Sequence, residues 1–228
     1  MHSFWMDDLP EPGAVFRLPL EEESHLFRIL RARPGERVRL LNGKGDSAEA
    51  EVRSGRELEA VARHTADAPE LRLVLACAAP RRQKLDTLLK QAVELGVSEI
   101  HLVQCARSVA KPEGASRWPA LLREACKQSG NLFLPRIEVH DSLACALDSL
   151  ADARLFFGAV TLPDAPFPPV PAAGRVAFLA GPEGGFTAEE ESVMAARGAL
   201  GISLGPWILR LETAAVAGLA VLRARGAK

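Results

Sequence analysis

The chain has 228 residues, of which 25% are charged and 48% are apolar, and its formal net charge is -1. This composition is that of a globular protein and excludes disordered and collagen-like classes. Because the net charge is close to zero, a site for a polyanion has to come from local clusters of basic residues.

The cysteines form no recognisable metal or disulfide pattern. Cys77, Cys105, Cys126 and Cys145 are widely spaced, and no CxxC, His-x-His or His-Glu-x-x-His motif accompanies them. We therefore expect no disulfide framework and no metal. The N-terminus is acidic where a secretory signal would be basic, and no apolar run reaches membrane-spanning length. These features predict a soluble cytoplasmic protein with no membrane partner.

The first 68 residues are typical of a small β-rich domain. Short apolar stretches at 14–20, 36–55 and 57–65 alternate with Pro-Gly, Asn-Gly and Ser-Gly turns, which is the pattern of brief strands. Residues 64–70, "HTADAPE", form a plausible linker, and the pattern changes after them.

Residues 69–228 predict an α/β domain. The continuous apolar strand 71–79 is followed by a helix with one apolar face, which Gly96 ends, and then by the strand 98–105. A strand, a helix and a strand in this order indicate a right-handed crossover in a mostly parallel sheet. The later expected elements are a helix at 116–129, strand 136–140, helix 142–151, strand 154–160, a Pro-rich loop at 161–174, strand 175–180, a helix, strand 201–205 and a last helix.

A glycine-rich turn follows the predicted strand 175–180. Three of the five residues from 181 to 185 are glycine, and Thr187 with Glu190 forms a capping box that starts the next helix. Open α/β sheets bind ligands at this end of their strands. The P-loop and Rossmann spacings are both absent, and Glu183 would repel a phosphate. The turn therefore suits a ligand without phosphates, although a plain connecting turn is the alternative.

A second glycine turn precedes the last helix, within "LGPWILRLETAAVAGLAVLRA" at 204–224. Arg210, Glu212 and Thr213 stand before a helix that is apolar on nearly all faces and is therefore expected to be buried on several sides. Two such turns after two strands predict a crevice walled by backbone. The alternative is a core helix whose Arg210 and Glu212 pair on the surface.

Several segments resemble, in the expected order, the RsmE family of ribosomal RNA methyltransferases, which modify N3 of a uridine in 16S RNA. They are "HLFRILRARPGERVRLLNGKG", "LLKQAVELGVSEIHLV", "KQSG", "LAGPEGGFTAEE" and "LGPWILRLETAA", and the match runs from about residue 25 to 225. The resemblance implies an α/β protein with a PUA-like β-barrel (1–68) and a SPOUT methyltransferase domain (69–228). It also implies a trefoil knot near the C-terminus and a homodimer.

The resemblance further implies S-adenosylmethionine as cofactor and 16S rRNA, or the assembled small ribosomal subunit, as partner. The cofactor-binding residues carried over from the family are Leu179, Gly181, Pro182, Glu183, Gly184, Gly185, Leu204, Gly205, Ile208, Leu209, Thr213 and Ala214. Uracil N3 has to lose its proton, and a cation near the uracil oxygens favours the deprotonated ring. Arg210 is the candidate for that cation, and Glu212 would orient it or accept a proton, with a structural ion pair as the alternative.

Basic residues gather in two places that could contact RNA phosphates. They are Arg28, Arg31, Arg33, Arg37, Arg39 and Lys44 in the first domain, and Arg81 and Lys84 at the start of the helix after strand 71–79. A solvated strand face is the alternative for the first group. Two rival functions stay open. One is a relative that binds RNA and cofactor but modifies a different RNA or none, because Trp207 and Asn131 stand where members of the resembled family usually have arginine. The other is an enzyme for another nucleotide-like ligand.

Overall fold

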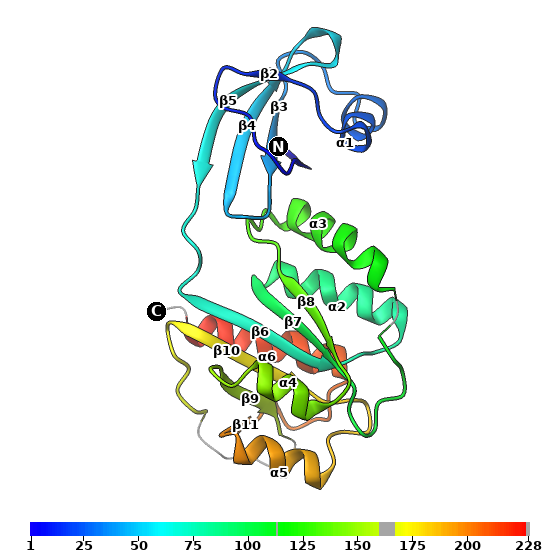
Figure 1. Cartoon of the computed structure of the whole chain (residues 1–228), viewed down its shortest axis with the longest axis vertical. Coiled ribbons are helices and arrows are strands. Elements are labelled where there is room, and N and C mark those ends of the chain that lie inside the picture. The colour runs from blue at the N-terminus through cyan, green and yellow to red at the C-terminus, as the bar shows by residue number, and fades with distance from the viewer. Residues whose placement is uncertain (113, 160–166, 227–228) are drawn as a thin grey trace. The chain divides into compact units, whose positions relative to one another are not determined.

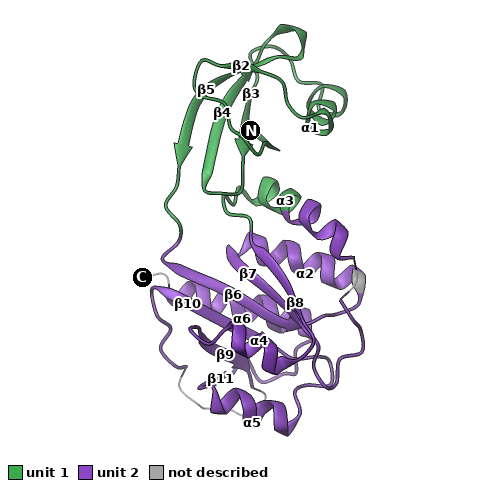
Figure 2. Ribbon diagram, viewed as in Figure 1, with its two compact units in different colours: residues 1–68, 123–134 green, residues 69–122, 135–228 purple. Residues whose placement is uncertain are grey.

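The computed structural model describes residues 1–112, 114–159 and 167–226, traced along the chain in Figure 1. They form two compact units, coloured separately in Figure 2. The N-terminal unit contains residues 1–68 and 123–134, and the C-terminal unit contains 69–122 and 135–228.

The N-terminal unit is built on a five-stranded sheet. Its strands are β1 (His2–Trp5), β2 (Val15–Phe16), β3 (Arg37–Leu41), β4 (Asp46–Val52) and β5 (Leu58–Thr65), in the order β1-β3-β4-β5-β2. The short helix α1 (Leu20–Ser24) continues into a π-helical turn (His25–Ile29), and a 3-10 turn (Ser54–Arg56) joins β4 to β5. Along β3, Val38 and Leu40 are buried while Arg37 is exposed, because alternate side chains of a strand point to opposite faces.

The predicted strands of this unit are confirmed in β3, β4 and β5, but the run 14–20 is only partly a strand, since β2 contains two residues. The sequence reading missed β1, which pairs in parallel with β3 from His2↔Val38 to Trp5↔Leu41. A parallel partner more than thirty residues away leaves no turn signal in the sequence, so local patterns could not reveal it.

Helix α3 (Trp118–Ser129) begins in one unit and ends in the other. The segment after it pairs with the β3–β4 turn, where Gly45 N donates to Leu132 O (3.0 Å) and Leu134 N donates to Gly43 O (2.9 Å). These bonds explain why 123–134 groups with the N-terminal unit, although the sequence reading placed it within 69–228.

Lys127 at the end of α3 is buried inside the N-terminal unit. Its Nζ lies 2.7 Å from Glu22 Oε1 and 2.5 Å from Glu124 Oε1. Burial alone would lower the pKa of Lys127, but the two carboxylates outweigh burial and raise it. Lys127 is therefore a paired structural cation, and it is not a free charge for a substrate.

The C-terminal unit is a six-stranded sheet in which every pairing is parallel. Its strands are β6 (Leu71–Ala78), β7 (Val97–Val103), β8 (Arg136–His140), β9 (Arg154–Gly158), β10 (Gly174–Ala180) and β11 (Leu200–Ile202), in the order β11-β9-β10-β6-β7-β8. The helices are α2 (Arg82–Glu94), α3, α4 (Leu143–Ser149), α5 (Ala188–Ala196) and α6 (Leu211–Gly226), and a 3-10 turn (Ala115–Arg117) precedes α3. The predicted alternation of strands and helices is confirmed.

Helix α6 packs against β6 and β10 in the core. A Cβ atom at Gly218 would lie 2.4 Å from the Phe178 ring, so only glycine lets this helix approach the sheet so closely. Helix α6 buries Ala215, Leu219 and Leu222, as its apolar sequence predicted.

Residues 161–166 of the predicted Pro-rich loop lie outside the described residues, and the trefoil knot stays a prediction. Among the helices in the described ranges, none is long and apolar enough to cross a membrane.

Candidate active site

The carboxyl ends of the parallel strands gather the predicted site segments at one edge of the sheet. The glycine turn 181–187 follows β10, the segment 203–210 follows β11, and the start of α2 follows β6. The loop 104–108 after β7 lies at the same edge. Because ligands of open α/β sheets bind at this edge, we call it the carboxyl edge and treat it as the candidate site.

The glycine turn is fixed by its own backbone and by the helix that follows. Gly185 N donates to Pro182 O (2.8 Å), and Gly185 adopts φ +71°, a left-handed conformation that favours glycine. Thr187 Oγ1 accepts from Glu190 N (3.2 Å), while Glu190 Oε2 accepts from Thr187 N (2.9 Å). The predicted capping box is thus confirmed.

Arg107, in the loop after β7, holds the same turn from the other side. Its Nη1 donates to Gly184 O (2.8 Å) and to Phe186 O (3.3 Å). Ala106 N also donates to Glu190 Oε1 (2.9 Å), which joins this loop to the first turn of α5. The sequence reading missed Arg107. The available signal was its position directly after the apolar strand 98–105, where α/β sites gather polar residues.

Close backbone approaches explain two of the glycines. A Cβ at Gly184 would lie 3.2 Å from Arg107 Cδ, and one at Gly181 would lie 3.1 Å from the Phe186 ring. Glu183, Gly184 and Gly185 are exposed, so the turn offers backbone groups to a ligand. Pro182 is buried, and Leu179 is only 1% exposed, which confines any contact of Leu179 with a ligand to its backbone.

The segment before α6 exposes apolar side chains at this edge. Trp207 is 81% exposed and Ile208 is 82% exposed. Gly205 has φ +125°, a conformation that L side chains rarely adopt. The other predicted cofactor residues of this segment are half-buried (Leu204, Leu209, Ala214) or exposed (Thr213).

The two predicted catalytic residues lie at the start of α6, and Lys84 joins them. Lys84 Nζ is 2.8 Å from Glu212 Oε1, while Arg210 is exposed. Burial would raise the pKa of Glu212, but the hydrogen bond from Lys84 and the charges of Lys84 and Arg210 lower it overall. Glu212 is therefore a carboxylate at neutral pH. Its Oε2 is buried and has no hydrogen-bond partner among the described residues.

The predicted RNA-contacting residues of the N-terminal unit lie mostly on the surface. Arg28, Arg31, Arg33, Arg37 and Lys44 are exposed, and Arg39 is half-buried. Arg37 forms a 3.8 Å ion pair with Glu49 on the neighbouring strand. In the C-terminal unit Arg81 is exposed directly before α2, whereas Lys84 turns to Glu212.

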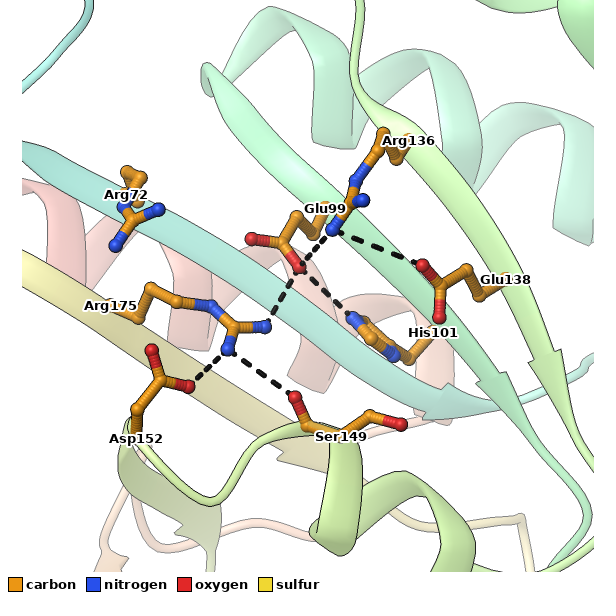
Figure 3. A pocket seen from close by; sticks show the side chains of 8 residues that line it. All are labelled: Arg72, Glu99, His101, Arg136, Glu138, Ser149, Asp152 and Arg175. Carbon is orange, nitrogen blue, oxygen red and sulfur yellow. Dashed lines mark hydrogen bonds and ion pairs between the residues drawn. The ribbon is translucent and has the colours of Figure 1, made fainter.

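A polar cavity of about 250 Å³ lies at the opposite edge of the same sheet, near the amino ends of β6, β7, β8 and β10. Figure 3 shows the eight side chains that line it. Three arginines and three carboxylates are among them, and Glu99 binds Arg175 at 2.8 Å. The sequence did not predict this amino edge, because its residues come from four strands and from the segment at the end of α4, which are far apart in the chain.

Comparison with known families and structures agrees with the architecture. A model described as "RNA methyltransferase domain" matches residues 67–223, and one described as "RNA methyltransferase PUA domain" matches residues 21–62. The expected fold, a PUA domain followed by a SPOUT-type parallel-sheet domain, is confirmed.

Similar proteins from several bacteria are named ribosomal RNA small subunit methyltransferase E. The chain is 28% identical to ribosomal RNA small subunit methyltransferase E of Mycobacterium bovis, over 95% of this chain and 88% of that protein. It is 25% identical to the protein of that name from Bacillus subtilis, over 93% and 91% of the two chains. The crystal structure of ribosomal RNA small subunit methyltransferase E of Neisseria gonorrhoeae, bound to S-adenosylmethionine, superposes with a TM-score of 0.84 at 29% identity, over 98% and 97%. Since the first model matches well over half of the residues, this chain belongs to the RNA methyltransferase family, as the resemblance to RsmE enzymes implied.

Proposed function

We propose that this protein transfers a methyl group from S-adenosylmethionine to N3 of a uridine in 16S rRNA, in the cytoplasm. The observation that carries the proposal is the carboxyl edge itself. There the backbone-walled glycine turn, held by Arg107, lies at the same edge as the Lys84–Glu212 ion pair and Arg210. The relatives named above support the rRNA substrate.

The glycine turn suits this cofactor because the cofactor has no phosphate. The exposed residues 183–185 offer backbone N–H and C=O groups that can read an adenine edge, and no lysine is needed. Bound S-adenosylmethionine supplies a methyl group on a sulfonium for an in-line displacement. The protein's part is then to place uracil N3 opposite that methyl group.

Arg210, Glu212 and Lys84 would prepare the uracil for attack. The exposed Arg210 guanidinium can donate to a uracil oxygen and thereby stabilise the deprotonated ring. Glu212 is held ionised by Lys84, and its buried Oε2, which has no hydrogen-bond partner among the described residues, is an acceptor that can orient Arg210. Acceptance of the N3 proton by Glu212 stays a prediction. In this scheme Lys84 is a positioning residue, and its predicted contact with RNA phosphates stays a prediction.

The exposed apolar side chains at the carboxyl edge support a homodimer. Trp207 and Ile208 are more than four fifths exposed, and Val109 in the loop after β7 is 71% exposed. Large apolar side chains gathered at one edge are typical of a surface that a partner or ligand covers. We infer that a second copy covers this edge. Light scattering should give twice the chain mass, and Trp207→Ser should shift that mass towards the monomer.

Two measurements test the proposal. Calorimetric titration of the protein with S-adenosylmethionine should show binding, and absence of binding would reject the methyltransferase assignment. N3 methylation blocks the Watson–Crick edge, so reverse transcription of 16S rRNA should stop at the modified uridine. If deletion of the gene leaves every such stop in place, the assigned target is wrong.

The two measurements also separate the rival function. Cofactor binding with an unchanged stop pattern would favour a relative that modifies another RNA or none. Methylation of purified 16S rRNA and of assembled small subunits by the same protein would then identify the substrate form. Restoration of the stop by the intact gene in the deletion strain is the positive control.

A further inference from the structure

Next to the polar cavity, strands β7 and β8 bring together two histidines and a carboxylate. His101 lies on β7, while Glu138 and His140 lie two residues apart on the neighbouring strand β8, and their ligand atoms all lie within 4.8 Å of one another. Strand register explains the arrangement, because His101 pairs with Glu138 and Val103 pairs with His140. Residues paired or two apart in this way share one face of the sheet.

The two imidazoles meet at their nitrogen atoms. His101 Nδ1 lies 2.8 Å from His140 Nε2, with the ring planes nearly parallel at 12°. Only one of these nitrogens can carry the hydrogen between them, so the other presents a lone pair. Glu138 Oε2 lies 3.8 Å from His140 Nε2 and faces the same space.

Neighbouring charged side chains already orient His101. Its other nitrogen, Nε2, lies 3.5 Å from Glu99 Oε2, and Glu99 is itself bound by Arg175 at 2.8 Å. Figure 3 shows these contacts in sequence from Arg175 through Glu99 to His101. A carboxylate on the outer nitrogen is the usual partner of a metal-ligating histidine, because it fixes the ring and its tautomer. The contact leaves Nδ1 as the nitrogen that faces His140.

We propose that His101, His140 and Glu138 bind a divalent transition-metal ion, with Zn²⁺ as the best-suited ion. Two nitrogens and one carboxylate are a three-ligand set for zinc, with a fourth position left for water. Ligand atoms of a tetrahedral zinc ion lie about 3.3 Å apart, so the two nearest contacts need to change by only about 0.5 Å. The site borders the cavity of about 250 Å³, which provides an entry path.

Binding has a defined proton balance. The metal ion replaces the hydrogen between His101 Nδ1 and His140 Nε2, and that proton passes to the buffer. The ion would then join β7 to β8 through three side chains. The two oxygens of Glu138 have different partners, since Oε1 lies 3.9 Å from Arg136 and Oε2 faces His140.

The test is a Zn²⁺ titration of the full-length protein after treatment with a chelator, in competition with a chromophoric zinc indicator. A Cys145→Ser background removes the one exposed cysteine. We expect one Zn²⁺ per chain, and at least a tenfold loss of affinity in Glu138→Gln and in His140→Gln. His64→Gln, which changes an exposed histidine on β5, is the matched control and should keep the wild-type affinity.

Absence of an equimolar site, or equal affinities in wild type, Glu138→Gln and His140→Gln, would overturn the proposal. Circular dichroism of the metal-free variants separates loss of ligands from loss of fold. Co²⁺ provides an independent measurement, because its visible absorption reports nitrogen and oxygen ligands directly. That absorption should disappear in His140→Gln and persist in His64→Gln.

Discussion

The two edges of the C-terminal sheet are built in opposite ways. At the carboxyl edge the glycine turn, Trp207 and Ile208 are exposed, and backbone groups form much of the surface. At the amino edge Arg175, Glu99 and His101 are largely buried and bind one another. The difference indicates that the carboxyl edge is adapted to a ligand or partner from outside. At the amino edge the charged side chains bind one another, so Arg175 and Glu99 contribute to stability next to the zinc site that we propose.

The largest expected effect is on stability, at the amino edge. Arg175→Met leaves Glu99 without its nearest cation, and breaking a buried ion pair in this way costs about 3 kcal/mol of unfolding free energy. Arg136, 3.4 Å from Glu99, keeps the cost from being larger. Urea unfolding measures it. Arg154→Met, at an exposed residue at the start of β9, should cost less than about 0.5 kcal/mol. Equal costs for the two variants would remove the contrast between the edges.

The next effect is on catalysis, at the carboxyl edge. Arg210→Ala should lower the methylation rate about 100-fold, because it removes a cation that acts on the uracil as charge develops. Cofactor affinity should stay near that of the wild type, as titration calorimetry would show. Arg197→Ala, which removes an exposed arginine paired with Asp148 at 2.6 Å, is the control and should keep the rate. An unchanged rate in Arg210→Ala rejects the assigned role.

A smaller effect is expected at Arg107, which holds the glycine turn. Arg107→Ala removes two hydrogen bonds to backbone carbonyls and should weaken cofactor binding about tenfold. Lys111→Ala, in the same loop after β7, is exposed and should bind the cofactor like the wild type. If both variants bind the cofactor with wild-type affinity, the glycine turn keeps its conformation without Arg107. Cofactor binding at the carboxyl edge then depends on the backbone of the turn alone.

The pH dependence of stability should follow Glu99. Burial alone would raise the pKa of Glu99, but the charge and hydrogen bonds of Arg175 and the other donors outweigh burial. The pKa of Glu99 in the folded protein therefore lies below the ordinary value of a glutamate. A group of this kind stabilises the fold above its unfolded pKa, about 4.3, and loses that contribution as pH falls through the folded pKa. The stability lost by Glu99→Gln should therefore be largest near neutral pH and shrink in acid. Glu94→Gln, which removes an exposed carboxylate of α2, is the control variant.

The smallest effect is chemical and leaves the fold intact. Burial raises the pKa of the Cys77, Cys105 and Cys126 thiols to about 12, whereas Cys145 is exposed. A thiol reagent should label one cysteine rapidly in the native protein and four in denaturant. Rapid labelling of a second cysteine under native conditions would show that the C-terminal unit or α3 opens locally.

The same contrast between the edges explains what could be predicted from the sequence. The glycine turn is one continuous stretch of sequence, and so is the segment with Arg210 and Glu212. A sequence motif can therefore point to each of them before any contact is known. Glu99, Arg175 and Arg72 are each a single charge in an apolar strand. They meet only through the pairing of β10 with β6 and of β6 with β7, and strand order is not encoded in a local pattern. The elements of the α/β unit were predictable because their apolar runs have the period of the structure they form.

Helix α3 has a consequence for how this molecule can be divided. The chain passes between the two units three times, at residues 68/69, 122/123 and 134/135. A fragment that ends at Ala68 would lose the strand-like segment against Gly43 and Gly45, and Glu22 would lose Lys127. No single cut yields two intact halves. A chimaera that exchanges either unit has to carry residues 123–134 together with 1–68, because a junction at 68/69 alone would lose these contacts.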